Sequence, residues 1–368
     1  MKLRLKTEEF TELLTTVLPA VSGKTTLPTL SHFLIEAEKN RVKVYATDLE
    51  IGIESSIKTE VEKEGACTVP ARSLTDMVKA LDSEYITFKK ITESQYELSD
   101  GNTTFRLMGG EKEEFPVLPS VKEEETADIE ASKLKEGVEK TIFSVSRDES
   151  RYVLCGIYFN INTDSLEMVS TDGRRLSYFK EALTEENGSF NAIVPTKAIN
   201  VLDRALPGSD DKVKICVSAS ESQIYFSFAD TILYSRIIDG DYPNYSQVIP
   251  DKPTKSIIAD TKTLLDATRR MMAVTPEKFV AVKYRFADNT AVLSINAPET
   301  GSGTSNAKVE YNGEEIEIAF NPDFIINAMK VIKSEKVVLG LTTPINPGKI
   351  TPVSDTEKYI GVVMPMRP

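Results

Sequence analysis

The 368-residue sequence contains one histidine and three cysteines, and this scarcity argues against several kinds of site. A histidine-based acid–base mechanism would depend on His32 alone, and we expect that residue to be structural because it lies where a strand begins. Cys67, Cys155 and Cys216 stand singly, without a Cys-x-x-Cys pair. We therefore expect three buried thiols rather than a disulfide framework or a zinc site.

Long apolar runs and a nucleotide-binding loop are also missing from the sequence. No segment approaches 18 uncharged apolar residues, and the first residues, MKLRLKTEEF, lack the apolar core of a signal peptide. We therefore expect a cytoplasmic protein. The Gly/Ser-rich stretch at residues 296–308 lacks the Gly-Lys-Ser/Thr of a phosphate-binding loop, so we expect a surface loop there and no cofactor or metal.

A helical pattern occurs three times at nearly equal spacing. Residues 69–81 read VPARSLTDMVKAL, residues 194–206 read VPTKAINVLDRAL, and residues 320–332 read FNPDFIINAMKVI. The starts are separated by 125 and 126 residues. In each copy an extended stretch leads into a proline and then into apolar residues three and four apart, which predicts an amphipathic helix.

A second helical pattern precedes each copy, at residues 7–22, 131–146 and 260–275. Alternating apolar residues, for example over residues 42–57, predict strands between and after the helices. Two helix types that recur in one order and spacing indicate three copies of one unit. We predict an α+β protein in which helices cover one face of antiparallel sheets, with domains at residues 1–121, 127–249 and 255–368.

The connections between the repeats are short and polar. Residues 122–128, KEEETAD, follow the first repeat, and residues 251–255, DKPTK, follow the second. Proline and charge favour an extended, exposed linker in both places.

The net charge of −12 argues at first against binding to nucleic acid, because lysine and arginine supply the affinity for phosphate. The distribution of charge matters more than its sum. Counted with their flanking cations, over residues 7–24, 69–81, 131–147, 194–206, 260–275 and 320–333, the six helical segments together carry +4, and the rest of the chain carries −16. The helices are therefore the relatively basic part of an acidic protein, with residues 7–24, at −2, as the exception.

The sequence resembles the family of bacterial sliding clamps, the beta subunits of DNA polymerase III, over essentially its full length. The resemblance rests on several short strings in a fixed order together with the threefold repeat. These strings are LPTLSHFLIEA from Leu27, ATD from Ala46, VPAR from Val69, STDGRRLSY from Ser170, VPTK from Val194, YPNYSQVIP from Tyr242 and VVMPMR from Val362.

The resemblance implies a non-catalytic processivity factor. Each domain would hold two β-α-β-β-β halves, and two chains would pair head to tail into a six-domain ring lined by twelve helices. Double-stranded DNA threaded through such a ring is retained topologically and without regard to sequence, which suits an acidic protein with a mildly basic lining. The implied protein partners are the alpha subunit of DNA polymerase III, the clamp loader and other proteins that carry a clamp-binding motif.

The resemblance also assigns site residues. DNA-contacting positions of the family correspond to Lys24, Arg72, Arg147, Arg151, Tyr152 and Lys197. Val153 follows Tyr152 where the family often has a second tyrosine, and Lys24 stands where an arginine is familiar. Without the resemblance, each lysine or arginine of this set would be interpreted as an ordinary solvated side chain.

A pocket between the second and third domains would accept a short peptide of the Gln-Leu-x-Leu-Phe kind. By resemblance it is lined by Leu154, Thr171, Gly173, Arg175, Leu176, Pro243, Val248, Val362, Val363, Met364, Pro365, Met366 and Arg367. Arg174 replaces a histidine that is often seen after the glycine, and Pro368 replaces an aliphatic residue. From its sequence alone, the stretch Thr171-Asp172-Gly173 would be only a tight turn.

The ring interface would join the first domain of one chain to the third domain of the other. By resemblance it uses Arg72, Leu81, Phe105 and Leu107 against Met271 and Met272. The two methionines could equally be ordinary core residues.

Two other functions remain open at this stage. An enzyme could use Asp48, Asp172 or Asp239, but no nucleophile, metal cluster or cofactor loop accompanies these carboxylates. A diverged clamp paralogue could bind peptides as a scaffold without encircling DNA.

Overall fold

The computed structural model describes residues 1–23, 27–117, 125–183, 188–206, 211–274, 281–354 and 356–366. Six α-helices lie in these ranges: α1 (Thr7–Val17), α2 (Ala71–Lys79), α3 (Ala131–Thr141), α4 (Thr196–Ala205), α5 (Thr261–Met271) and α6 (Pro322–Lys330). Short 3₁₀ helices are η1 (Leu18–Ala20), η2 (Pro28–Ser31), η3 (Lys112–Glu114), η4 (Ile142–Ser144), η5 (Glu149–Leu154), η6 (Ala219–Glu221) and η7 (Tyr245–Gln247). None of the described helices is both long enough and apolar enough to cross a membrane.

The six α-helices are the six that the repeat predicts, and their boundaries follow from local chemistry. In α1 the residues Phe10, Leu13, Leu14 and Val17 are all buried, at the spacing of one helical face. At the start of α5 the Asp260 side chain accepts a hydrogen bond from the backbone N–H of Thr263. The proline of each second helix lies at its start or just before it, where no intrahelical N–H is needed.

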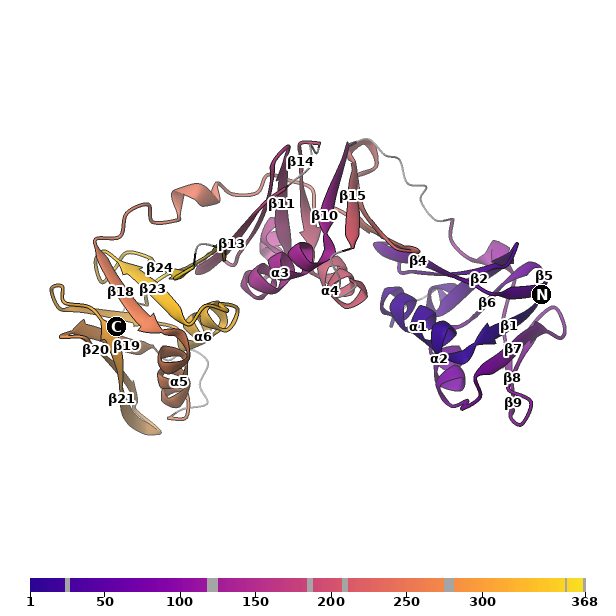
Figure 1. Ribbon diagram of the computed structural model, residues 1–368, viewed down its shortest axis with the longest axis horizontal. Coiled ribbons are helices and arrows are strands. Elements are labelled where there is room, and N and C mark those ends of the chain that lie inside the picture. Colours follow the sequence, from indigo (N-terminus) through magenta and orange to yellow (C-terminus); the bar gives the residue numbers. More distant parts are fainter. Residues whose placement is uncertain are drawn as a thin grey trace. The chain divides into compact units, whose positions relative to one another are not determined.

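The chain divides into two compact units, and the first comprises Met1–Ser132 and Lys197–Ile237. It holds a five-stranded sheet in the order β5 (Glu60–Lys63), β1 (Lys2–Lys6), β7 (Tyr85–Lys90), β8 (Gln95–Ser99) and β9 (Thr104–Met108). Its second sheet has eight strands: β10 (Glu125–Glu130), β15 (Lys212–Ser218), β16 (Gln223–Phe228), β17 (Thr231–Arg236), β4 (Ile51–Lys58), β3 (Arg41–Thr47), β2 (His32–Glu38) and β6 (Gly65–Pro70). Helices α1 and α2 pack against each other in this unit (Figure 1).

The second unit comprises Lys133–Thr196 and Ile238–Pro368 and contains one twelve-stranded sheet. Its order is β14 (Phe190–Pro195), β11 (Gly156–Asn162), β12 (Ser165–Thr171), β13 (Arg175–Ala182), β25 (Tyr359–Val363), β24 (Gly348–Pro352), β23 (Lys336–Leu341), β18 (Lys255–Asp260), β21 (Gly301–Glu310), β20 (Thr290–Ala297), β19 (Val282–Ala287) and β22 (Ile316–Phe320). Paired strands in all three sheets run antiparallel, as predicted.

Sheets continue from one repeat into the next. β4 of the first repeat pairs with β17 of the second, and β13 of the second pairs with β25 of the third. These ladders are made of backbone hydrogen bonds and hold paired strands in one compact unit. The two units therefore follow the sheets rather than the repeats, and each unit contains part of the second repeat.

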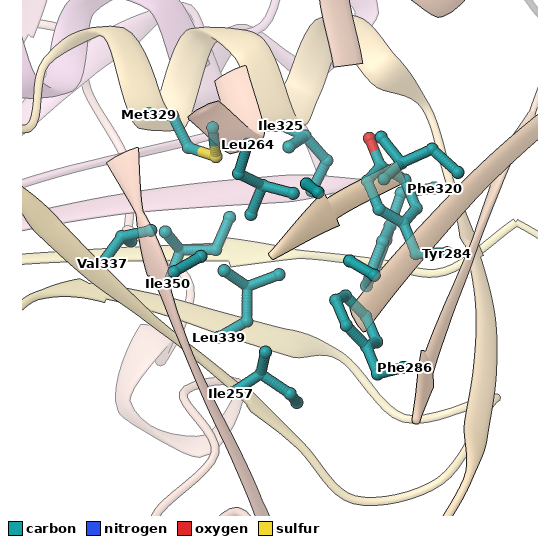
Figure 2. Close-up of a cluster of buried hydrophobic side chains, with 14 of the residues drawn as sticks. Ile257, Leu264, Tyr284, Phe286, Phe320, Ile325, Met329, Val337, Leu339 and Ile350 are labelled. Atoms are coloured by element: carbon teal, nitrogen blue, oxygen red, sulfur yellow. The ribbon is translucent and has the colours of Figure 1, made fainter. Parts of the chain in front are cut away.

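The core of the third repeat shows how helices α5 and α6 cover the sheet. Figure 2 shows Leu264, Ile325 and Met329 packed against the strand residues Ile257, Tyr284, Phe286, Phe320, Val337, Leu339 and Ile350. The hydroxyl of Tyr284 donates a hydrogen bond to Thr268 Oγ1 at 3.2 Å, which satisfies the polar end of a fully buried ring. Each fully buried apolar side chain of this kind stabilises the fold by about 1.5–3 kcal/mol.

Three predictions about local structure are wrong. The supposed surface loop at residues 296–308 is a hairpin, because most of it belongs to β20 and β21, whose cross-strand pairs run from Thr290–Lys308 to Ala297–Gly301. The expected linker at residues 122–128 overlaps β10, which begins at Glu125, whereas residues 251–254 form an irregular, largely exposed connection as predicted, and β18 begins at Lys255. Cys155 lies partly exposed before β11, whereas Cys67 and Cys216 are buried as predicted.

Candidate functional site

One face of the sheet formed by β11, β12, β13 and β25 carries three rows of neighbouring side chains. Cross-strand pairing places Thr171, Leu176 and Val362 in the first row. Since alternate residues of a strand share a face, the second row contains Tyr158, Val169, Tyr178 and Ile360, and the third contains Asn160, Glu167 and Lys180. The rows grade from apolar at one end to charged at the other.

A pocket of about 170 Å³ lies at the apolar end of this face. It is lined by Leu154, Thr171, Gly173, Arg175, Leu176, Pro243, Asn244, Tyr245, Val248, Val362 and Met364. Leu176 and Val362 are buried in its floor, whereas Val248 and Met364 are 45 % and 38 % exposed. The pocket therefore offers partly exposed apolar side chains over a packed apolar floor, which suits an apolar ligand.

Arg175 forms a cationic edge of the pocket. Its guanidinium lies 4.6 Å from the ring centre of Phe324 and 5.7 Å from that of Phe143, and its Nε donates to Asp172 at 3.0 Å. Within the described part of the chain, its Nη1 is buried and has no hydrogen-bond partner. Buried donors are normally paired, so this N–H lacks the partner that such groups usually have.

The rim of the pocket is a tight turn that also occurs in the first repeat. Asp172 accepts hydrogen bonds from the backbone N–H groups of Arg174 and Arg175, and Asp48 accepts from those of Glu50 and Ile51 in the same way. Gly173 has a φ of +82°, which glycine adopts at little cost. Two of the three carboxylates considered as acid–base groups, Asp48 and Asp172, are therefore turn caps.

His32 and Asp239 give no support to the enzyme hypothesis. His32 begins β2 at the predicted strand start, and burial lowers the pKa of its imidazole, so the ring is neutral at pH 7. Asp239 is exposed.

The structure brings nine of the predicted pocket residues together around one cavity. Val363, Pro365 and Met366 do not line it, and Arg367 lies outside the described residues. Val363 is buried on the opposite side of β25, next to Arg175 in the ladder.

Sequence reasoning missed Asn244 and Tyr245 in the pocket lining. The signal was present, because both lie between Pro243 and Val248 in a stretch that was already assigned to the site. A wall made by an irregular segment has no periodicity that tells which side chains turn inward.

The predicted DNA-contacting residues are exposed wherever the structure describes them. Arg72 lies in the first turn of α2, Arg147 follows η4, and Arg151 and Tyr152 lie in η5. The exposed fraction of Tyr152 is 57 %. Lys24 lies outside the described residues.

Lys197, at the start of α4, does not present a free charge. Its Nζ forms ion pairs with the carboxylates of Asp48 and Glu50, the latter at 3.4 Å. Burial alone would lower the pKa of Lys197, but these two carboxylates outweigh it and raise the pKa. Any phosphate would have to compete with them.

The predicted interface residues fall into two groups. Leu81, Leu107 and Met271 are at most 5 % exposed within a single chain, so they act as core residues and offer little area to a partner. Phe105 and Met272 are partly exposed, and Arg72 is exposed. Met108, which was not predicted, is 60 % exposed at the end of β9.

Comparisons with known proteins agree with this architecture. Family models for the N-terminal, central and C-terminal domains of the DNA polymerase III beta subunit match residues 1–119, 128–244 and 246–367. The beta sliding clamp of Synechococcus elongatus is 32 % identical, with 100 % of this chain and 99 % of that protein covered. The beta sliding clamp of Bacillus subtilis is 28 % identical, and both chains are covered in full.

Solved structures show the same fold. The DNA polymerase sliding clamp from Bacillus subtilis superposes with a TM-score of 0.94 at 28 % identity, over 100 % of this chain and 99 % of that one. A sliding clamp from Pseudomonas aeruginosa bound to griselimycin gives a TM-score of 0.95 at 27 % identity over the whole of both chains. With three clamp domains in order and a relative more than 30 % identical over its full length, this chain belongs to the family of DNA polymerase III beta subunits, the beta sliding clamps.

Proposed function

We infer that this chain works as a DNA sliding clamp, a non-catalytic processivity factor that encircles duplex DNA and tethers polymerases to it. The family and the three clamp domains support this function. The partners that follow from it are double-stranded DNA, the alpha subunit of DNA polymerase III, the clamp loader and other proteins with a clamp-binding motif. A replication role also favours a cytoplasmic location.

We propose that two chains form the ring head to tail, with domains at residues 1–121, 127–249 and 255–368. The first domain of one chain would meet the third domain of its partner, and Phe105, Met272 and Arg72 are the predicted interface residues that retain exposed surface. Lys24, Arg72, Arg147, Arg151, Tyr152 and Lys197 would face the DNA.

Retention on DNA tests encirclement directly. Clamp loaded onto a nicked circular plasmid should stay bound through gel filtration and leave once the plasmid is linearised, because a ring holds DNA topologically. Equal loss from both forms would instead favour the alternative, a clamp paralogue that serves as a peptide-binding scaffold.

The apolar pocket carries the proposal for how partners bind. A peptide of the Gln-Leu-x-Leu-Phe kind would place its Leu and Phe against Leu176, Val362 and Met364, and each side chain would gain about 1.5–3 kcal/mol on full burial. Ordering the peptide offsets part of the gain, so we expect a Kd on the order of micromolar.

Fluorescence polarisation with a labelled peptide tests the pocket. We expect binding by the wild type and none by Leu176→Asp/Met364→Asp, because two charges would lie in an apolar cavity. The matched control is Ile91→Asp/Val117→Asp, which alters two exposed apolar residues outside the pocket lining, at 43 % and 98 % exposure, and should leave binding unchanged. If the pocket variant still binds the peptide, the pocket is not the peptide-binding site.

A further inference from the structure

The outer wall of the pocket is irregular chain. Pro243, Asn244, Tyr245 and Val248 line the pocket, yet no residue between positions 237 and 254 belongs to a strand of the described structure. The wall contains a single short 3₁₀ helix, η7, in which the N–H of Val248 donates to the carbonyl of Tyr245 at 3.1 Å. A wall without a backbone ladder depends on its side chains for its position.

Two tyrosines attach the wall to the sheet face beneath it. Tyr242 stacks on Tyr158 of β11, with ring centres 4.9 Å apart and planes within 10°. Tyr245 lies over the same face, with its ring centre 6.1 Å from that of Tyr158 and 6.0 Å from that of Tyr178. These contacts set the height of the wall above the sheet, but flat rings can slide over each other.

Glu167 of β12 fixes the lateral position of Tyr245. The Tyr245 hydroxyl donates to Glu167 Oε2 at 2.7 Å, and the Tyr178 hydroxyl donates to Oε1 at 2.9 Å. Lys180 Nζ and Asn160 Nδ2, the cross-strand neighbours of Glu167, also donate to it, at 2.9 and 3.3 Å. One carboxylate thus accepts bonds from both the sheet and the wall.

The carboxylate of Glu167 is held in its charged form. Burial alone would raise its pKa, but the hydrogen bonds from Tyr245, Lys180, Tyr178 and Asn160 outweigh burial and lower the pKa. Hydrogen bonds to an ionised acceptor are roughly twice as strong as those between neutral groups. The Glu167–Tyr245 bond is therefore a charge-assisted directional contact between the sheet and the wall.

We propose that Glu167 is a positioning residue for the partner peptide: through Tyr245 it holds the outer wall of the pocket in the form that binds. The proposal rests on the proposed function of the pocket. Glu167 itself does not line the cavity, so its effect on affinity must pass through the wall. Without the bond, only a fraction of molecules would carry the wall in place, and the apparent affinity would fall to that fraction of its full value.

Peptide affinity in a double-mutant cycle tests the proposal. Glu167→Ala and Tyr245→Phe should each weaken binding of the labelled Gln-Leu-x-Leu-Phe peptide about tenfold, and the double variant should be little weaker than either single one, because both remove the same bond. Glu167→Gln keeps an acceptor and should recover part of the loss. The matched control is Glu317→Ala, which removes an exposed ion pair with Lys283 in the same sheet and should bind as the wild type does.

Hydrogen exchange separates positioning from a general loss of structure. In Glu167→Ala we expect faster exchange confined to residues 242–249, with the strands of the sheet unchanged. If the wild type binds the peptide and the affinity of Glu167→Ala is within twofold of the wild-type value, the positioning role is overturned while the pocket's proposed function stands. Additive effects of the two substitutions in the cycle would have the same meaning. No binding by the wild type would overturn the pocket's proposed function, and the positioning proposal with it.

Discussion

At the scale of single residues, the charged groups that matter are those whose partners are built into the fold. Glu167 accepts four hydrogen bonds, and Lys140 of α3 is a second case. The Lys140 side chain is 1 % exposed and pairs with Glu136 at 2.7 Å and Glu357 at 3.0 Å. Glu357 also accepts hydrogen bonds from the backbone N–H groups of Lys333 and Ser334, both at 3.1 Å. Such groups stabilise the fold only while the whole set is intact.

Lys140→Ala should be strongly destabilising. The change leaves the carboxylate of Glu357, which is 8 % exposed, without its cation, and breaking a buried pair costs about 3–5 kcal/mol. Urea unfolding followed by circular dichroism measures the loss. Lys133→Ala is the matched control on the same helix: its ion pair with Glu181 is 39 % exposed on the lysine side, so we expect about 0–1 kcal/mol. Equal losses in both variants would contradict the special role of the buried set.

The lowered pKa of Glu167 makes a prediction about pH. A carboxyl whose pKa is lower in the folded state stabilises the fold above its ordinary pKa of 4.5, and this contribution is lost as pH falls through the folded-state value. Burial raises the pKa values of the facing tyrosines, Tyr178 and Tyr245, so both keep their protons over this range. Glu167→Gln should therefore be less stable than the wild type at pH 7, by about 1–3 kcal/mol, and the difference should shrink below pH 4.5. Unfolding curves at several pH values measure it, and a difference that grows on acidification would be inconsistent with the lowered pKa.

At the scale of secondary-structure elements, the repeated units use the same devices with different residues. Asp48 and Asp172 cap equivalent turns, and the position after each has a positive φ, +77° at Leu49 and +82° at Gly173. Helices lie so close to their sheets that some positions have room only for glycine. In α3 a Cβ on Gly137 would meet the sulfur of Met168 and would lie 2.9 Å from Cδ1 of Phe179.

Gly137→Ala should destabilise the protein although alanine favours helices. The helix gains about 1 kcal/mol in propensity, but overpacking against the sheet costs about 1–3 kcal/mol, so packing prevails. A lower midpoint of thermal unfolding is the expected result. Glu139→Ala, at an exposed position of the same helix, should change stability by no more than about 0.5 kcal/mol. A Gly137→Ala protein with a raised midpoint would show that the sheet can move away.

At the scale of the whole molecule, the repeats and the sheets divide the chain differently. The three family domains follow the repeats, whereas the sheets join β4 to β17 and β13 to β25 across them. The pocket draws its lining from two repeats because one such ladder brings β25 beside β13. Met108 of the first repeat is 60 % exposed and Met272 of the third is partly exposed, so both have apolar surface that the single chain does not bury.

Met272→Asp should convert a dimer into a monomer. The substitution would place a charge in a contact that excludes water, at a residue that one chain alone leaves partly exposed. Sedimentation equilibrium should then report half the wild-type mass. Ile345→Asp, which changes a residue that is 79 % exposed and outside the predicted interface, is the control and should keep the dimer mass. If both variants remain dimers, the interface does not include Met272.

The sequence by itself determined the repeat, the six helices and the antiparallel α+β class, because helix periodicity and proline position are local properties. It also pointed to most of the pocket lining through the short strings it shares with the clamp family.

Only the tertiary structure decided which predicted residues are available. Lys197 is neutralised by Asp48 and Glu50, Met271 is buried in the core, and Tyr245 turns into the pocket. Each of these depends on contacts between residues that are far apart in the chain, and such contacts leave no local pattern in the sequence. The same reason explains the misread hairpin of β20 and β21, where cross-strand pairing overrides the preference of Gly and Ser for loops.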